Sequence, residues 1–205
     1  MKKKKKAMSR PKAKAKAKAR KIRVSTKAAE KVSSDVAKIS IIAGENFYDI
    51  AQVKAKGREE NLMKAIEAHN RALSFYTLKD HPNDYAMTQN NLGNAYRCLA
   101  GVKDKEKNLE LAMKAFHEAL RVHTRDAFPI NYAGIRFNLG HLYLAMAGMY
   151  SKKGNKGQEK KSLKQAEVAF AESLKLFRKE RITEWIEEAT KHLAAVRRFI
   201  NQIKD

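Results

Sequence analysis

The sequence contains few residues that interrupt helices or cross-link chains. Among 205 residues there are three prolines, nine glycines and one cysteine, Cys98. A single cysteine excludes an intramolecular disulfide and is compatible with a reducing, cytoplasmic environment. Scarce proline and glycine, together with abundant alanine, leucine, lysine and glutamate, predict an all-α protein. No apolar run is long enough for a transmembrane helix, so none is expected.

Motifs of enzymatic chemistry are also missing. There is no Gly-rich phosphate loop of either common type. The six histidines form neither an HExxH motif nor a Cys/His cluster, so no metal site is expected. Cys98 has no matched histidine and aspartate that would make it a nucleophile. The segment Asp80-His81-Pro82 is interpreted as a turn between helices. We therefore expect a protein that is not an enzyme and that needs no cofactor.

Acidic residues are absent from the N-terminal segment, residues 1–27. This segment contains 14 Lys or Arg residues and accounts for most of the formal net charge of +22. No apolar segment follows the first charges, so a secretory signal is not expected. Lysine alternates with alanine over 12–19, which places like charges next to each other on any helix face. This repulsion predicts a disordered tail over residues 1–27 and a moderately basic folded domain over 28–205.

The basic tail is expected to attract polyanions. Its Lys/Ala-rich composition resembles the tails of linker histones and bacterial histone-like proteins. Because no aromatic side chain interrupts the lysines, contact with nucleic acid would be salt-dependent and blind to sequence. Two other interpretations remain open: a solubilising tail without a dedicated partner, and a segment for anionic membranes or targeting. The candidate polyanion-binding residues are Lys2, Lys3, Lys4, Lys5, Lys6, Lys12, Lys14, Lys16, Lys18, Arg20, Lys21 and Arg23.

Two segments of the chain are versions of the same sequence. Residues 71–93 read RALSFYTLKDHPNDYAMTQNNLG, and residues 118–140 read EALRVHTRDAFPINYAGIRFNLG. Matched positions, such as Pro82 with Pro129 and Gly93 with Gly140, are 47 residues apart. Internal repetition with this period is typical of stacked helical arrays, which usually hold other molecules rather than carry out chemistry.

Apolar residues at three- and four-residue steps predict the helices of the array. Pro82 and Pro129 are each expected to open a helix, and the polar loop at 151–157 is expected to end one. The expected helices cover residues 83–99, 108–124, 130–149, 159–179 and 183–203.

The repeated residues resemble the tetratricopeptide repeat. One copy reads Leu92-Gly93-x-x-Tyr96, then Ala112-x-x-x-Phe116-x-x-Ala119-Leu120, then Pro129. The next reads Leu139-Gly140-x-x-Tyr143, then Ala166-x-x-x-Phe170-x-x-Ser173-Leu174. Partial earlier matches are Ala43-Gly44-x-x-Phe47 and Ala65-x-x-x-His69-x-x-Ala72-Leu73. The resemblance covers residues 28–203 and implies an earlier unit with helices over about 28–56 and around 65–73.

This resemblance implies an antiparallel helix-hairpin solenoid of three units, closed by a cap at 183–203. Gly93 and Gly140 would lie where paired helices approach closely, and the aromatic residues would fill the space between units. The units span 47 and 54 residues, whereas the family's standard period is 34. The additional residues lie between the two helices of a unit. The chain is thus similar to the long-period variants found in kinesin light chains and in bacterial and archaeal arrays.

The resemblance also implies a function in protein binding. First helices of such arrays line a concave face that receives an extended peptide. The inward candidates are Asn90, Asn94, Arg97, Phe137, Asn138 and His141. Asn90 and Asn94 share a helix face, and a carboxamide can both donate and accept. Arg97 could bind a carboxylate or phosphate. Simple solvation of the asparagines is the alternative interpretation.

Two functions are therefore expected to compete. The first is a non-enzymatic adaptor that binds a protein or peptide in the groove. The second is a nucleic-acid-associated protein whose tail binds phosphate while the repeats recruit a partner.

Overall fold

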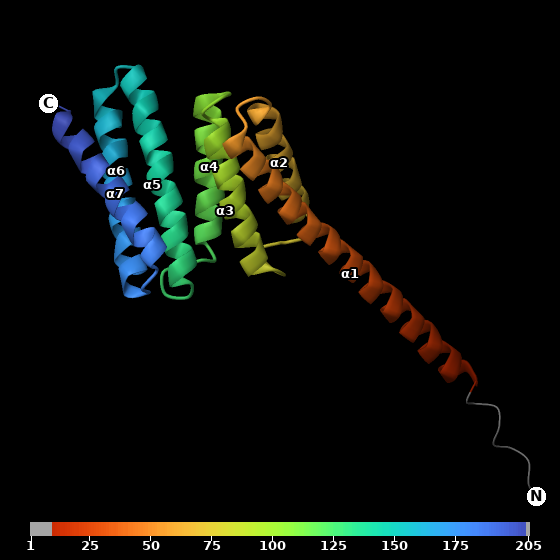
Figure 1. Cartoon of the computed structure of the whole chain (residues 1–205). Helices are drawn as coiled ribbons and strands as arrows, with labels where there is room; N and C mark the ends of the chain where they lie inside the picture. The colour runs from red at the N-terminus through yellow and green to blue at the C-terminus, as the bar shows by residue number, and fades with distance from the viewer. Residues whose placement is uncertain (1–9, 204–205) are drawn as a thin grey trace, which may run out of the picture.

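The computed structural model describes the backbone of residues 10–203 and the side chains of residues 26–203. Within this range the chain forms helices and no strand (Figure 1). The helices are α1 (Arg10–Val53), α2 (Arg58–Leu73), α3 (Pro82–Leu99), α4 (Lys105–Leu120), α5 (Pro129–Lys152), α6 (Lys156–Lys179) and α7 (Thr183–Gln202). The all-α fold class predicted from composition is confirmed for the described residues.

The ends of the helices follow local sequence signals. Pro82 and Pro129 occupy the first turns of α3 and α5, where a missing N–H costs nothing. The Asn155 side chain caps α6 by accepting a hydrogen bond from the Gln158 backbone N–H at 3.1 Å. Gly154, which links α5 to α6, has a φ of 68°, a conformation that favours glycine. The helices predicted over 83–203 are confirmed, with end positions shifted by no more than about four residues.

Helix α1 differs most from the sequence-based expectation. Disorder was predicted through residue 27, but α1 begins at Arg10 and is continuous to Val53. Alanine and lysine both have high helix propensity, and no glycine or proline interrupts residues 12–43. Once the C-terminal part of α1 is packed, extending the helix needs no new nucleus, so propensity outweighs the lysine repulsion. Residues 1–9 of the predicted tail lie outside the described residues.

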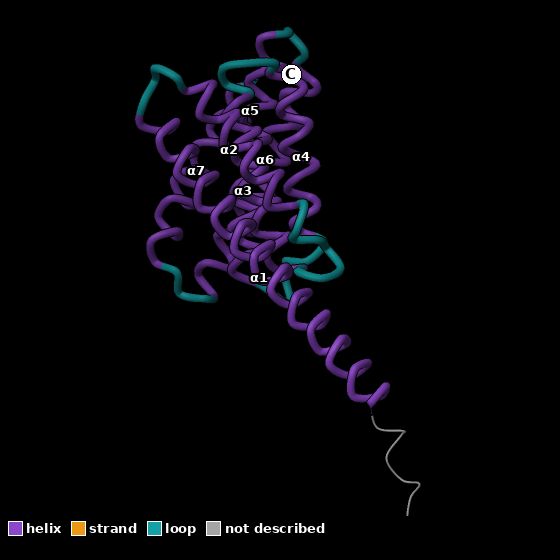
Figure 2. The backbone as a smooth tube through the Cα atoms, turned by 90° about the vertical axis from the view of Figure 1, so that its right-hand side faces the viewer, coloured by secondary structure: helices purple, strands orange, loops and turns teal. Residues whose placement is uncertain are grey.

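Each helix packs against the next one along the chain, so that α1–α2, α3–α4 and α5–α6 form hairpins. Helix α3 also contacts both α1 and α5, which places these three helices next to one another in order. The start of α1 and the end of α7 lie at opposite ends of the molecule, and the N-terminal half of α1 projects away from the other helices (Figures 1 and 2). No helix among the described residues is long and apolar enough to cross a bilayer.

The same close contact holds each hairpin together. A Cβ atom added to Gly93 would lie 2.7 Å from the Phe116 ring, and one added to Gly140 would lie 2.6 Å from the Phe170 ring. In the first hairpin, a Cβ on Gly44 would lie 2.5 Å from the ring of His69. The predicted role of the glycines in close helix approach is therefore confirmed. The weak first copy of the sequence pattern also folds as a hairpin with this contact.

Two large apolar clusters join the hairpins. The first surrounds Phe116 and reaches Leu139 and Leu142 of α5, so it connects the second hairpin to the third. The second surrounds Phe170 and includes Leu193 and Val196 of α7. Helix α7 therefore covers apolar surface of α6, as expected for a closing helix. Phe116 packs inside the second hairpin and Phe170 inside the third. Each ring also belongs to the apolar cluster shared with the next helix, α5 for Phe116 and α7 for Phe170.

Candidate functional site

A cavity of about 460 Å³ lies between α3 and α5, with Trp185 of α7 and Glu45 of α1 also lining it. Its wall is rich in carboxamides from both central helices. The asparagines that line it are Asn90, Asn91, Asn94, Asn131 and Asn138. Helices α1, α3 and α5 lie next to one another, so side chains from successive hairpins meet in one place.

The carboxamides form a partly completed hydrogen-bond network. Asn138 of α5 donates from Nδ2 to Oδ1 of Asn90 of α3 at 3.0 Å, which links two hairpins. Asn91 donates from Nδ2 to the Glu45 carboxylate at 3.0 Å. The Asn94 Oδ1 atom is buried and has no hydrogen-bond partner among the described residues. Because an unmade hydrogen bond at a buried acceptor costs about 1–3 kcal/mol, this atom favours a ligand that brings an N–H group.

Apolar side chains surround this polar wall. Met87, Ile130 and Trp185 line the cavity, and each side chain is between 42 and 48% exposed. Large apolar residues with this exposure offer surface that a bound chain could cover. The cavity thus combines donors and acceptors suited to a peptide backbone with apolar surface suited to its side chains.

Four of the six predicted groove residues come together at the cavity. Asn90, Asn94 and Asn138 lie in its wall, and the buried Phe137 ring lies beneath it, edge-on to Trp185 at 5.5 Å between centroids. Phe137 therefore holds Trp185 in place at the cavity. Arg97 and His141 do not line the cavity.

Arg97 and His141 lie close to each other, outside the residues that line the cavity. The His141 ring packs edge-on against Phe137 at 4.8 Å and against His192 at 4.4 Å. Burial, together with the nearby charges of Arg97 and His192, lowers the pKa of His141 to about 3. His141 is therefore neutral at pH 7 and serves packing. The Arg97 Nε atom is buried without a hydrogen-bond partner among the described residues, one helix turn from Asn94.

Sequence reasoning missed several residues of the site. Met87 is three residues before Asn90, and Asn131 is seven before Asn138, so helical periodicity places both on the faces already identified. Trp185 comes from a different helix, and no local pattern associates it with α3 or α5.

A second surface of interest is basic and lies on α6. Lys160, Lys161 and Lys164 line a cavity of about 610 Å³, together with Arg136 of α5. Further along α6, Lys175, Arg178 and Lys179 line a neighbouring cavity of about 700 Å³. Two acidic residues of α6 pair with arginines of other helices: Glu167 with Arg197 at 2.8 Å, and Glu172 with Arg136 at 2.7 Å. This face of α6 therefore carries a net positive charge.

The predicted tail residues lie on a different helix or outside the described residues. Lys12, Lys14, Lys16, Lys18, Arg20, Lys21 and Arg23 belong to the N-terminal turns of α1, and Lys2 to Lys6 lie outside the described residues. Within the part of the chain whose side chains are described, no three His, Cys, Asp or Glu side chains gather in a way that could hold a metal ion. No protein-family model, curated protein or solved structure matches this chain.

Proposed function

We propose that this protein is a tetratricopeptide-like array that acts as an adaptor by binding an extended polypeptide segment in the cavity between α3, α5 and α7. The observation that carries the proposal is the buried Asn94 Oδ1 atom, which has no partner among the described residues and lies beside the bonded Asn90–Asn138 pair. A backbone N–H group of a bound peptide supplies the missing donor.

The repeated architecture supports this proposal. The glycine–ring contact occurs in all three hairpins, and each hairpin packs against the next. Stacking of equivalent hairpins into a superhelix places the first helices α1, α3 and α5 along one side, where they form an extended binding surface.

The residues around the cavity favour an extended ligand that has apolar side chains and one acidic group. His141 is neutral, and Glu45 is the acidic residue at the α1 edge. An extended segment with apolar side chains matches the wall of Met87 and Ile130. Arg97, with its unpartnered Nε atom, would receive a ligand carboxylate or phosphate just beyond the asparagines.

The binding proposal predicts a specific loss of affinity. Peptides selected from a displayed library against the full chain should bind the Asn94→Ala, Arg97→Ala double variant about 30-fold more weakly, which corresponds to about 2 kcal/mol for one neutral and one charge-assisted hydrogen bond. Fluorescence anisotropy measures the change in Kd.

The matched control is Asn70→Ala. Asn70 is exposed on α2 and does not line the cavity between α3 and α5, so this variant should keep the original Kd. Thermal midpoints of all variants should agree within a few degrees. An unchanged Kd for the double variant would remove the groove assignment.

A second candidate function is supported by the basic face of α6 and by the charge of residues 1–27. A protein with two basic regions could associate with nucleic acid through its phosphates while the cavity recruits a partner. In this case the affinity comes from neutralised phosphates and not from base contacts.

Nucleic-acid binding is expected to depend steeply on salt. Retention of duplex DNA by the full chain should fall strongly between 50 and 200 mM salt (about 10³-fold for six phosphate contacts) and should disappear when residues 2–23 are deleted. If the truncated chain retains DNA, Lys160→Glu with Lys164→Glu should remove the remainder. Lys79→Glu with Lys114→Glu is the control of equal charge change outside α6. No retention at 50 mM salt would eliminate this candidate.

A further inference from the structure

Helix α1 carries an apolar stripe that no described part of the chain covers. Val32, Val36, Ile39 and Ile42 are spaced by four, three and three residues, and each side chain is 49 to 65% exposed. Ile50 and Val53 extend the stripe toward the end of the helix. From Val32 to Val53 the stripe is about 30 Å long at about 1.5 Å per residue.

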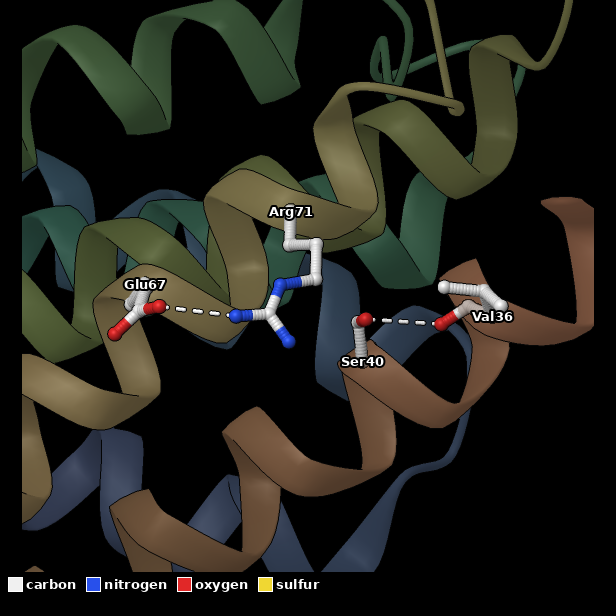
Figure 3. A network of polar contacts seen from close by, with 4 residues as sticks. All are labelled: Val36, Ser40, Glu67 and Arg71. Atoms are coloured by element: carbon white, nitrogen blue, oxygen red, sulfur yellow. Dashed lines mark hydrogen bonds and ion pairs between the residues drawn. The ribbon is translucent and has the colours of Figure 1, made fainter.

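This stripe faces away from the rest of the molecule. The buried side of α1 contains Ala37, Ser40 and Gly44, which point toward α2. Figure 3 shows the Ser40 hydroxyl on the side of α1 that faces Arg71 of α2, with its donated bond to the Val36 carbonyl at 2.9 Å. The exposed stripe is turned away from this side by the 100° step per residue. The side chains of the stripe belong to the C-terminal half of α1 and are exposed there, so a partner can reach them.

One edge of the stripe carries charges of both signs. Lys27, Lys31 and Lys38 lie along this edge in the N-terminal and central parts of the stripe, and Glu45 and Asp49 lie along the same edge near the end of the helix. All five residues are exposed. The other edge of the stripe carries no charged residue over residues 28–53. The charged edge is therefore basic at one end and acidic at the other.

This arrangement of charge indicates what covers the stripe. In two parallel copies of α1 the charged edge of one helix would meet the uncharged edge of the other, so no ion pairs would form. In two antiparallel copies the charged edge of one helix would lie beside the charged edge of the other, and the two edges would run in opposite directions. Lys31 of one copy would then lie opposite position 47 of the other, between Glu45 and Asp49 and within one helix turn of both. A second copy of this chain in antiparallel orientation thus pairs opposite charges at both ends of the edge, while the two Lys38 side chains lie near each other at its centre.

The distribution of charge along the chain also favours antiparallel pairing of two α1 helices. Residues 1–27 carry 14 basic and no acidic side chains. Parallel pairing would hold two such segments side by side, whereas antiparallel pairing separates them by the length of the paired helices.

We propose that the stripe is the interface of a homodimer, in which α1 pairs with α1 of a second copy in antiparallel orientation, centred near Ile39. In this register Ile39 faces its own equivalent and Val36 faces Ile42. Asp35 and Asn46 are the polar residues on this face, and both lie toward its charged edge. Burial of the aliphatic stripe drives association, and the complementary charges set the orientation.

The oligomeric state of the nuclease-treated full chain tests this proposal by sedimentation velocity. The wild type should form a species of twice the 23.3 kDa chain mass at micromolar concentration. Ile39→Glu should weaken dimerisation at least 100-fold without loss of helical circular dichroism, because it places two facing carboxylates in the interface. Val168→Glu, at a similarly exposed valine of α6, should leave the dimer intact. A wild type that is monomeric at 100 µM, or equal effects of the two variants, would overturn the proposal.

Charge reversal tests the orientation. Lys31→Glu should weaken the dimer about tenfold, because the change acts at both symmetry-related ends of the interface. Adding Asp49→Lys should restore the affinity to within about threefold. Asp49 is chosen because Glu45 also accepts a hydrogen bond from Asn91 within its own chain. A parallel pair would be insensitive to both changes, since its charged edges would not meet each other. Insensitivity would therefore reject the antiparallel arrangement.

Discussion

Replacement of Gly140 by alanine is expected to destabilise the protein by about 2–3 kcal/mol, a large effect for a single methyl group. The added Cβ atom would lie 2.6 Å from two ring atoms of Phe170, whose side chain is fully buried. Because the interior is close-packed, the ring cannot move away without displacing α7 or its own helix. The free-energy cost of overpacking is therefore larger than the gain of about 1 kcal/mol that alanine brings through its higher helix propensity.

The same helix offers the matched control. A Cβ atom added to Gly148 of α5 would have no neighbour within 4 Å, so Gly148→Ala should stabilise the protein by about 0.5–1 kcal/mol. Urea unfolding at equilibrium measures both changes. Adding Phe170→Leu to Gly140→Ala should recover part of the lost stability, since it removes the atoms that the new methyl group meets. Equal stability of the two alanine variants would contradict the proposed close approach of α5 and α6.

Replacement of His69 by phenylalanine is expected to stabilise the protein, by about 1 kcal/mol at pH 7.5 and by about 3 kcal/mol at pH 5. His69 contacts Gly44 in the first hairpin, at the position that Phe116 and Phe170 occupy in the other two. Its Nδ1 atom is buried without a hydrogen-bond partner among the described residues. Phenylalanine fits the same glycine notch in the other hairpins and has no polar atom to satisfy.

The pH dependence follows from the direction of the pKa shift. Burial lowers the pKa of His69 in the folded protein to about 4, compared with about 6.5 for a free histidine. Between these values the unfolded chain binds more protons than the folded chain. The free energy of unfolding is therefore fully retained above about pH 6.5 and decreases as the pH falls toward 4. At pH 5 this contribution of His69 is about 2 kcal/mol, and the phenylalanine variant does not lose it.

Urea unfolding of wild type and His69→Phe at pH 7.5 and pH 5.0 measures the difference. His141, His123 and His192 also have lowered pKa values, but they are present in both proteins, so the comparison isolates His69. His117→Phe, at an exposed position of α4, is the control for an added phenylalanine ring and should change the free energy of unfolding at pH 7.5 by less than about 0.5 kcal/mol. A stability difference for His69→Phe that did not grow on acidification would contradict the assignment of a buried neutral histidine.

Much of the fold could be predicted because its signals are local. Pro82 and Pro129 mark helix starts by themselves, and the Leu-Gly pairs identify the close contacts of the second and third hairpins. The N-terminal part of α1 could not be predicted, because it depends on a balance between high helix propensity and charge repulsion over residues 10–27. The repulsion between the lysines, considered without their helix propensity, led to the prediction of disorder.

The candidate site was predictable only in part for a different reason. Asn90, Asn94 and Asn138 are placed by the repeat, so the pattern alone brings them together. The packing of His141 and the position of Trp185 both depend on ring contacts between α5 and α7, the final helix. Contacts between elements far apart in the chain decide these residues, and no spacing within one helix contains that information.

Site-specific photo-crosslinking at the cavity tests the binding proposal most directly. A photoreactive amino acid replaces Met87, an exposed side chain of the cavity wall, in the full chain, and the protein is irradiated in nuclease-treated native lysate. From Met87 we expect discrete crosslinked polypeptides that disappear when Asn94→Ala and Arg97→Ala are also present. The same photoreactive group at Val168 of α6 should give no crosslinked polypeptide. Identical crosslinks from the two positions, or none from Met87, would contradict the binding proposal.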